Sequence, residues 1–496
     1  MTPRAFLKNV FSQTSVQILL MLRAIVLLPV LSKVLGPVYY GIWSQIVITV
    51  TLLATVFTLR FDIVFVRYFS AKQDRQVERE AFFSMAFCIL IMLIPLTVMM
   101  FLFMRNLAAI IFNDLTYTEY IPVLFVLLTL RVFFLFFLAY FRAGQRIVLY
   151  SAIQSAQILF EIIIFYFSIL YFHNSLLGTL KILIVFNFLI TAAIIFRVLL
   201  HLKPSKPRWS RLKPYLMYGL PLIPNISLQW LVSNSGRYFI AHYQNLEHVG
   251  IYAAYFSLGR MISFFYTPLT FVLYPALSKF WEESKFDEAK KWICHIIRMF
   301  LFVSVPTIFG LTYMAPYILD VLAGSGFSQY GAAILLLSSG FLCLGIYQVY
   351  VYMLHMNEKT VWILILFIFV ALLNIGLNWV MVPKMGIEGA ALATFVSYAV
   401  QAVSLYIVVS RVNHLDFPFL FFLKTVISAG IMYAGIRFIR PDRMIEIVPV
   451  IFLAGFCYLI LMFVFRGIRK EDRDLVRKTL GINNRNRDSM TNNKMT

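Results

Sequence analysis

Long apolar stretches alternate with short polar connections along almost the whole chain. Because a hydrocarbon core of about 30 Å needs about 20 apolar residues per helix, windows of that length predict transmembrane helices. The first six windows fall at 10–31, 42–66, 82–104, 120–141, 149–171 and 178–196. The other eight fall at 214–236, 250–273, 292–315, 331–354, 362–382, 389–410, 419–436 and 445–465. The pattern therefore predicts an all-α polytopic membrane protein with about 14 transmembrane helices.

The second group of helices repeats the first at an offset of about 210 residues. Residues 40–43 fall on 249–252, and residues 159–161 fall on 372–374. Chance alignment of apolar sequences is the alternative, but matched loops and helix order favour two pseudo-symmetric six-helix lobes. We expect the lobes at 1–200 and 214–411, a basic cytoplasmic linker at 201–213, two additional helices within 412–466 and a basic cytoplasmic tail at 467–496. Parallel repeats of this kind are typical of transporters, with the substrate path between the halves.

The basic residues are distributed unequally between the two sides of the predicted membrane. Twenty-nine lysines and arginines fall on the side of the termini and seven on the other side, within a formal net charge of +21. By the positive-inside rule both termini are cytoplasmic, so the charge indicates topology rather than nucleic-acid binding. A contact of the tail with anionic lipids is a secondary expectation.

Features of enzymes and metal proteins are missing from the sequence. The connections are short, no GxxxxGK phosphate loop occurs, and Cys88, Cys294, Cys343 and Cys457 lie far apart in apolar runs. We therefore expect no metal, no cofactor and no catalytic residues. The polar stretch 2–11 leads directly into the first helix, so a cleaved signal peptide is not expected either.

Four charged residues fall near the middle of predicted helices, where a charge costs a few kcal/mol and needs a partner or water. Arg131 and Glu161 belong to consecutive antiparallel helices, which favours a structural ion pair between them. Arg23 and Arg260 have no comparable acidic neighbour. This favours a wet cavity that receives an anion, with hydrogen bonding to helix carbonyls as the alternative.

Arg60 lies near the end of the second predicted helix, beside Asp62. Side chains two residues apart on a helix do not face each other, so we do not expect Asp62 to be its local partner. Arg60 either reaches the cytoplasmic interface or receives an anionic headgroup.

The seventh predicted helix has one polar face, formed by Asn225, Gln229, Ser233 and Arg237 in steps of four. This face forms either a helix–helix contact or a cavity wall. Just before it, Gly219, Pro221 and Pro224 interrupt backbone hydrogen bonding. We predict a hinge at these three residues, with a rigid kink as the alternative.

Glycine and proline motifs follow one another in a characteristic order. They are LGPVYYGIW at 35–43, LRFD at 59–62 with Arg67, GLPLIP at 219–224, VGIY at 249–252, NIGLN at 374–378 and VPKMGIEGAA at 382–391. In this order they resemble the polysaccharide and oligosaccharide flippases of the multidrug/oligosaccharidyl-lipid/polysaccharide exporter superfamily. The resemblance covers nearly the whole chain. It implies a central cavity between the first, second, seventh and eighth helices, with Arg23, Arg60 and Arg260 on helices that carry cavity cations in similar lipid flippases.

The resemblance implies transfer of a polyprenyl-diphosphate-linked oligosaccharide to the outer leaflet of the cell membrane by alternating access. We expect Arg23, Arg60, Arg260, Asn225, Gln229 and Arg237 to bind this substrate. Such transfer serves surface polysaccharide biosynthesis, for example of O-antigen or exopolysaccharide, with membrane lipids and polysaccharide assembly proteins as partners.

Two other classes of protein are alternatives. A cation-coupled multidrug exporter of the same superfamily would carry acidic residues within its bundles, whereas the buried charges here are mainly basic. A membrane glycosyltransferase or polysaccharide polymerase would need acidic residues or a large domain in an outer loop. The loop at 31–41 contains no Asp or Glu, so we expect a transporter and not an enzyme.

Overall fold

The computed structural model describes residues 3–69, 74–357, 360–413, 415–439 and 444–467, and these residues form helices and short connections without strands. The predicted cytoplasmic tail lies almost entirely outside the described residues. The helices of the first half are α1 (Pro3–Val34), α2 (Pro37–Phe57), α3 (Phe61–Phe69), α4 (Arg75–Leu102), α5 (Met104–Phe112), α6 (Tyr120–Ala143), α7 (Ile147–Tyr166) and α8 (Leu176–His201). The short helical turn η1 (Leu115–Tyr117) precedes α6, and the turn η2 (Phe167–Tyr171) follows α7.

The second half continues with the same alternation of long helices and short connections. Its helices are α9 (Leu212–Gly219), α10 (Leu222–Tyr243), α11 (Leu246–Gly259), α12 (Ser263–Glu282), α13 (Phe286–Ala323), α14 (Gly331–Met356), α15 (Thr360–Asn413), α16 (Phe419–Ile436) and α17 (Met444–Val464). Short turns η3 (Trp209–Arg211), η4 (Arg260–Ile262) and η5 (Ser325–Phe327) precede α9, α12 and α14.

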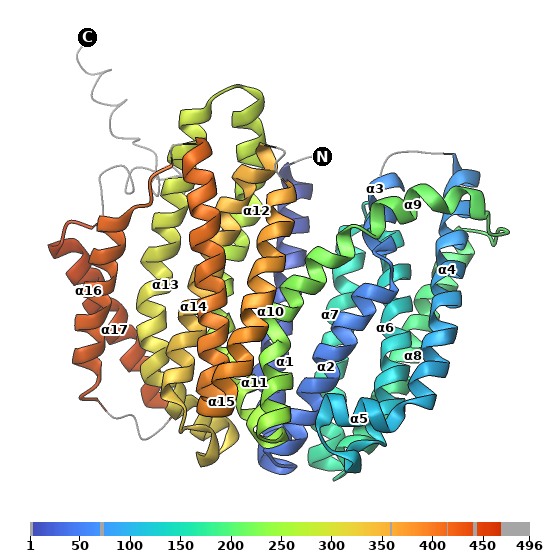
Figure 1. Cartoon of the computed structure of the whole chain (residues 1–496), viewed down its shortest axis with the longest axis horizontal. Coiled ribbons are helices and arrows are strands. Elements are labelled where there is room, and N and C mark those ends of the chain that lie inside the picture. Colours follow the sequence, from blue (N-terminus) through green and yellow to red (C-terminus); the bar gives the residue numbers. More distant parts are fainter. Residues whose placement is uncertain (1–2, 70–73, 358–359, 414, 440–443, 468–496) are drawn as a thin grey trace, which may run out of the picture.

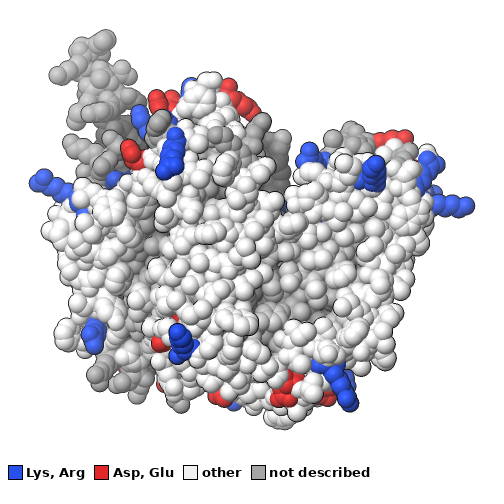
Figure 2. Space-filling model, viewed as in Figure 1, with Lys and Arg blue, Asp and Glu red and all other residues white. Residues whose placement is uncertain are grey.

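The prediction of an all-α polytopic membrane protein is confirmed. Among the described residues, ten helices are long and apolar enough to cross a membrane. One of them, α15, contains two predicted spans that meet at Gly386, where the backbone leaves helical geometry. The seventh and eighth predicted spans are each broken, into α9 with α10 and α11 with α12. In the space-filling view, charged side chains gather toward two opposite ends, and the band between them is almost free of charge (Figure 2).

Two lobes lie side by side, with α1, α2, α10 and α11 in the middle and α16 and α17 beside α13 at the outer edge (Figure 1). We call the end of the molecule at which α1 begins the N-terminal face, and the other end the opposite face. At the N-terminal face the surface is hollowed between the lobes (Figure 2).

At the opposite face the lobes close through a reciprocal contact between α2 and α11. A Cβ atom on Gly41 would overlap with the carbonyl oxygen of Leu246, and one on Gly250 would overlap with the carbonyl oxygen of Pro37. The same sequence offset relates Pro37 to Leu246 and Gly41 to Gly250. Equivalent positions of the two lobes therefore meet across a pseudo-twofold axis, and only glycine permits this approach of two helix backbones.

The chain passes from one lobe to the other at the break between α9 and α10. Helix α9 packs on α3 and α4 of the first lobe, with the guanidinium of Arg67 stacked 4.1 Å from the ring centre of Tyr218. Helix α10 packs chiefly on α15 of the second lobe. The expected start of the second lobe at residue 214 thus falls within a helix that contacts the first lobe.

The basic linker before α9 is also held by the first lobe. Arg79 Nε donates to the carbonyl oxygen of Lys203 at 2.8 Å, and the carboxylate of buried Glu80 lies 3.3 Å from Arg208. The backbone nitrogen of Arg208 donates to Ser84 Oγ at 2.8 Å. These contacts tie residues 203–208 to α4.

Candidate functional site

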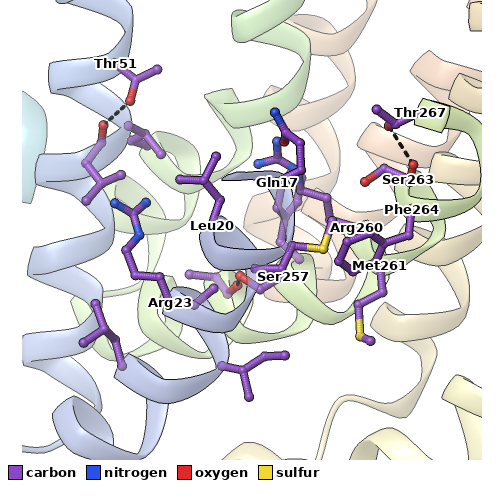
Figure 3. Close-up of a pocket in the computed structure, with 18 of the residues that line it drawn as sticks. Gln17, Leu20, Arg23, Thr51, Ser257, Arg260, Met261, Ser263, Phe264 and Thr267 are labelled. Atoms are coloured by element: carbon purple, nitrogen blue, oxygen red, sulfur yellow. Dashed lines mark hydrogen bonds between the residues drawn. The ribbon is translucent and has the colours of Figure 1, made fainter. Parts of the chain in front are cut away.

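A cavity of about 950 Å³ lies between the two lobes. Its walls come from α1, α2, α10, α11, η4 and α12, with the end of α6 and the start of α7 added near the N-terminal face. These include the first, second, seventh and eighth predicted helices. Figure 3 shows Arg23 on one wall and Arg260 on another, with Leu20 between them.

Four arginines line this cavity, namely Arg23, Arg142, Arg237 and Arg260, whereas none of the described lining residues is Asp, Glu or Lys. The arginines lie at different depths. Arg142 is at the end of α6, on the N-terminal face. At 1.5 Å per residue, Arg260, Arg23 and Arg237 lie about 21, 16 and 9 Å from the opposite-face ends of their helices. The four arginines are therefore distributed along the length of the cavity.

Arg23 forms an ion pair with Glu161 across the contact between α1 and α7. Its Nη1 donates to both carboxylate oxygens of Glu161, at 3.1 and 3.0 Å. The prediction that Glu161 pairs with Arg131 is therefore wrong, as is the expectation that Arg23 has no acidic neighbour. The reason is packing, because α1 lies along α7 and contacts it far more extensively than α6 does.

Arg131 instead joins a hydrogen-bond network whose other members, Gln157 and Asn187, are uncharged. Its Nη1 donates to Gln157 Oε1 at 3.2 Å, and Gln157 Nε2 donates to Asn187 Oδ1 at 2.7 Å. This chain joins α6, α7 and α8 inside the first lobe, one turn of α7 away from Glu161.

Arg237 is a buried cation at the closed end of the cavity. Its guanidinium lies 4.9 Å from the ring centre of Phe256, and Nη1 donates to Asn234 Oδ1 at 3.4 Å. Its Nε is buried and has no hydrogen-bond partner among the described residues. Arg237 was expected on the polar face of the seventh helix, and the structure places it inside α10, with 7% of its surface exposed and its side chain lining the cavity.

Arg260 lies in the turn η4, where the eighth span breaks. It is exposed to the cavity and has no carboxylate within 4.0 Å among the described residues. The break places Arg260 at the junction of α11 and α12, where it lines the cavity.

Arg60 does not line the cavity, and the structure corrects its expected relation to Asp62. Leu59 and Arg60 have φ of 49° and 55°, so the second span is broken between α2 and α3. Helical spacing, which would separate the two side chains, does not apply in this turn. Arg60 Nη2 lies 3.8 Å from Asp62 Oδ2, and the two residues form an ion pair.

The polar face of the seventh span is divided between two environments. Gln229 accepts from Gln401 at 3.5 Å and Ser233 bonds to the Tyr398 hydroxyl at 2.8 Å, so both face α15. Asn225 and Gln229 are not among the residues that line the cavity, whereas Arg237 is.

The three predicted hinge residues surround the break between α9 and α10. Helix α9 ends at Gly219, Pro221 precedes α10, and Pro224 lies in the first turn of α10. A Cβ atom on Gly219 would lie 2.5 Å from the carbonyl oxygen of Leu59. The break in the seventh span therefore packs directly on the break in the second.

Several lining residues were not expected from the sequence. Arg142 directly follows the predicted helix 120–141 and is one of the twenty-nine basic residues that were counted on the side of the termini. Its position next to a helix end was a usable signal. Trp230 and Asn234 lie one position from the polar face of α10, and Tyr40 and Ser257 belong to α2 and α11. The periodicity of α2 and α11 did not single out Tyr40 and Ser257, because most positions of these helices are apolar.

No group of three or more His, Cys, Asp or Glu residues that could hold a metal occurs in the described part of the chain. The polar chemistry of the cavity is carried by guanidinium groups, hydroxyls and side-chain amides.

The fold is similar to those of solved membrane flippase and transporter structures. A structure of the lipid II flippase MurJ in an inward closed conformation matches with a TM-score of 0.74 at 18% identity, over 95% of this chain and 99% of that one. An inward-facing multidrug resistance MATE family transporter of the MOP superfamily matches with a TM-score of 0.63 at 13% identity, over 81% and 94%.

The sequence comparisons are more specific. The model of the family described as "Polysaccharide biosynthesis protein" matches residues 6–281, more than half of the chain. The chain belongs to this family, and the resemblance seen in its motifs is confirmed. The probable low-salt glycan biosynthesis flippase Agl15 of Haloferax volcanii is 21% identical over 278 residues, which are 54% of this chain and 59% of that protein. The match therefore spans less than two thirds of that relative.

Proposed function

We propose that the chain is a flippase that moves a polyprenyl-diphosphate-linked oligosaccharide from the cytoplasmic to the outer leaflet of the cytoplasmic membrane. The row of arginines along one cavity between the lobes is the observation that carries this proposal. Agl15 is named as a glycan biosynthesis flippase and MurJ as a lipid II flippase. These names support a lipid-linked glycan as the substrate class here.

The charge balance of the cavity favours an anion. Arg23 is neutralised by Glu161, but Arg142, Arg237 and Arg260 have no carboxylate within 4.0 Å among the described residues. Arg237 is buried, where an uncompensated charge is costly, while Arg142 and Arg260 are exposed. Guanidinium groups in this arrangement are suited to replace the water that a diphosphate loses. The glycan would occupy the polar cavity while the lipid chain remains in the bilayer.

The difference between the two ends of the cavity supports alternating access as the mechanism. The hollow at the N-terminal face, which we assign to the cytoplasm together with both termini, admits the headgroup (Figure 2). The contact between α2 and α11 closes the outer side. Because α9 moves with the first lobe and α10 with the second, relative rotation of the lobes must be absorbed between Gly219 and Pro224, which is the proposed hinge.

The membrane potential supplies a driving force. Moving a diphosphate outward from a negative interior is favourable by about 2.3 kcal/mol per charge per 100 mV. Two negative charges thus gain about 4.6 kcal/mol at 100 mV, without a catalytic step.

Replacement of Arg237 or Arg260 by alanine tests the proposal. Removing one partner of a buried charged contact costs about 2–5 kcal/mol, so we expect surface glycan export to fall about 30-fold or more. The variant Arg197→Ala, which removes an exposed arginine at the end of α8, is the matched control and should export normally. The protein must be present in the membrane at equal amounts in all strains.

Normal glycan export by both cavity variants would refute the substrate assignment. Efflux of cationic drugs by energised vesicles would favour a drug exporter. Release of sugar from a lipid-linked donor by the purified protein would make it an enzyme.

A further inference from the structure

The linker at 203–213 has a defined position at the edge of the first lobe, next to α4 on the N-terminal face (Figure 1). Arg79, Glu80 and Ser84 of α4 hold it there by hydrogen bonds and an ion pair. Basic side chains gather at this end of the molecule (Figure 2). The linker therefore presents its own side chains in a fixed place beside the outer surface of α4.

Trp209 lies at the border between the linker and the lipid-facing surface of α4. Its side chain is 53% exposed, and its ring packs edge-on against Phe87 with the ring centres 5.7 Å apart. Phe87 begins a row of exposed apolar residues that follows α4 toward the opposite face and includes Leu90, Ile91 and Ile94. Such a row on a membrane helix contacts acyl chains, and tryptophan is enriched at the level of the headgroups above them. The position of Trp209 therefore places the linker in the headgroup layer.

The linker adds positive charge at this level. Its exposed lysines are Lys203, Lys206 and Lys213. The chain contains no Asp or Glu between residues 202 and 219. On α4, Glu80 is buried and paired with Arg208, whereas Asp74 and Glu78 lie near the start of the helix. Among the described residues, no carboxylate lies within 4.0 Å of the three lysines, so their charges are available to a partner.

We propose that the linker surface, formed by Lys203, Lys206, Trp209 and Lys213, binds an anionic phospholipid. The lysines contact its phosphate, and Trp209 packs on the upper part of the acyl chains beside Phe87. Basic clusters next to a membrane helix attract anionic lipids in this way. This inference does not involve the glycan or the arginines of the cavity.

The exposed indole distinguishes a lipid from other anionic partners. A free phosphate ion offers no apolar surface to Trp209. An acidic protein segment would match the lysines, but the row of apolar residues that begins at Phe87 lies in the membrane-spanning band rather than above it. A phospholipid has an anionic group and acyl chains in the same order as the lysines, Trp209 and the apolar row.

The test is native mass spectrometry of the purified full chain, which counts bound lipids. The chain is titrated in a non-ionic detergent with phosphatidylglycerol, which is anionic, or with phosphatidylcholine of the same acyl chains, which has no net charge. Because each lysine near an anionic surface contributes about fivefold in affinity, we expect the first phosphatidylglycerol to bind about tenfold more tightly, or more. Inorganic phosphate at constant ionic strength should not displace it.

Variants localise the site. Substitution of Lys203, Lys206 and Lys213 together by glutamine should lower the affinity for phosphatidylglycerol to that for phosphatidylcholine and leave the latter unchanged. Trp209→Ala should weaken the binding of both lipids, because its contact does not depend on the headgroup charge.

The matched control replaces three exposed lysines of the connection between α12 and α13 by glutamine, namely Lys279, Lys285 and Lys291. It removes the same number of charges, but Glu283 already pairs with Lys279 and Lys285. This control should bind phosphatidylglycerol like the wild type. Size-exclusion chromatography and thermal unfolding should show that all variants are folded.

Equal affinity of the wild type for the two lipids would overturn the inference, and so would unchanged binding by the linker variants. An equal loss of affinity in the control would show that net charge matters and not the linker surface. Displacement by inorganic phosphate would identify a phosphate site instead of a lipid site. Each of these results would leave the proposed function intact, since it is tested by export of the glycan.

Discussion

The reciprocal glycine contact between α2 and α11 leads to a prediction about access to the cavity. A Cβ atom on Gly250 would overlap with the Pro37 carbonyl oxygen and lie 3.1 Å from the backbone nitrogen of Gly41. These are backbone atoms, which cannot rotate away, so Gly250→Ala must separate the two helices. Overpacking of this kind costs about 1–3 kcal/mol. If this cost destabilises only the conformation in which α2 and α11 are in contact, the population in which the two helices are separated rises about 5- to 140-fold.

Cysteine labelling measures this population. Ala24 lines the cavity on α1 and accepts a cysteine with little change in volume. In a variant that lacks the four native cysteines, we would follow labelling of Ala24→Cys by a membrane-impermeant maleimide added to the opposite face of oriented proteoliposomes. The labelling rate should rise by the factor above when Gly250→Ala is added.

Gly376→Ala is the matched control, because a Cβ atom on this glycine of α15 would meet no atom of a neighbouring element within 4 Å among the described residues. It should label at the parent rate. Equal labelling of the Gly250 variant and the parent, with both proteins folded by size-exclusion chromatography and thermal unfolding, would refute the reasoning. The contact between α2 and α11 would then not close the cavity.

Three further predictions concern the framework around the cavity. Asn374 accepts a hydrogen bond from Ser235 at 2.6 Å and donates one to Ser397 at 2.9 Å. Asn374→Leu should therefore lower the free energy of unfolding in detergent by about 1–2 kcal/mol. An unchanged value would show that the network does not stabilise the second lobe. Glu80→Ala removes the ion-pair partner of Arg208 in the linker. Because a hydrogen bond to a charged group contributes about 1.5 kcal/mol, trypsin should cleave the linker of this variant about tenfold faster. Equal cleavage rates would contradict the prediction. Pro221→Ala should slow glycan transport, because it alters the proposed hinge. Binding of a short-chain prenyl diphosphate ester of a single sugar should stay unchanged, because the arginines are intact. Full transport would favour a rigid kink.

Sequence alone determined the all-α membrane-spanning class and the approximate positions of most helices. A membrane-spanning helix satisfies its own backbone hydrogen bonds, so its existence follows from about 20 consecutive apolar residues without knowledge of its neighbours. The same local reasoning selected Arg23 and Arg260, because the cost of a charge depends on its depth in the span. The structure places both in one cavity.

The tertiary structure decided which side chains meet. Glu161 pairs with Arg23 because α1 packs along α7, Arg60 reaches Asp62 because the second span breaks, and Gln229 faces α15 rather than the cavity. Helices that are apolar on every side give no periodic signal for the face that contacts a neighbour, since lipid and protein neighbours are similarly apolar. Depth in the membrane is therefore readable from sequence, whereas rotation about the helix axis and the choice of partner depend on the packing of the whole bundle.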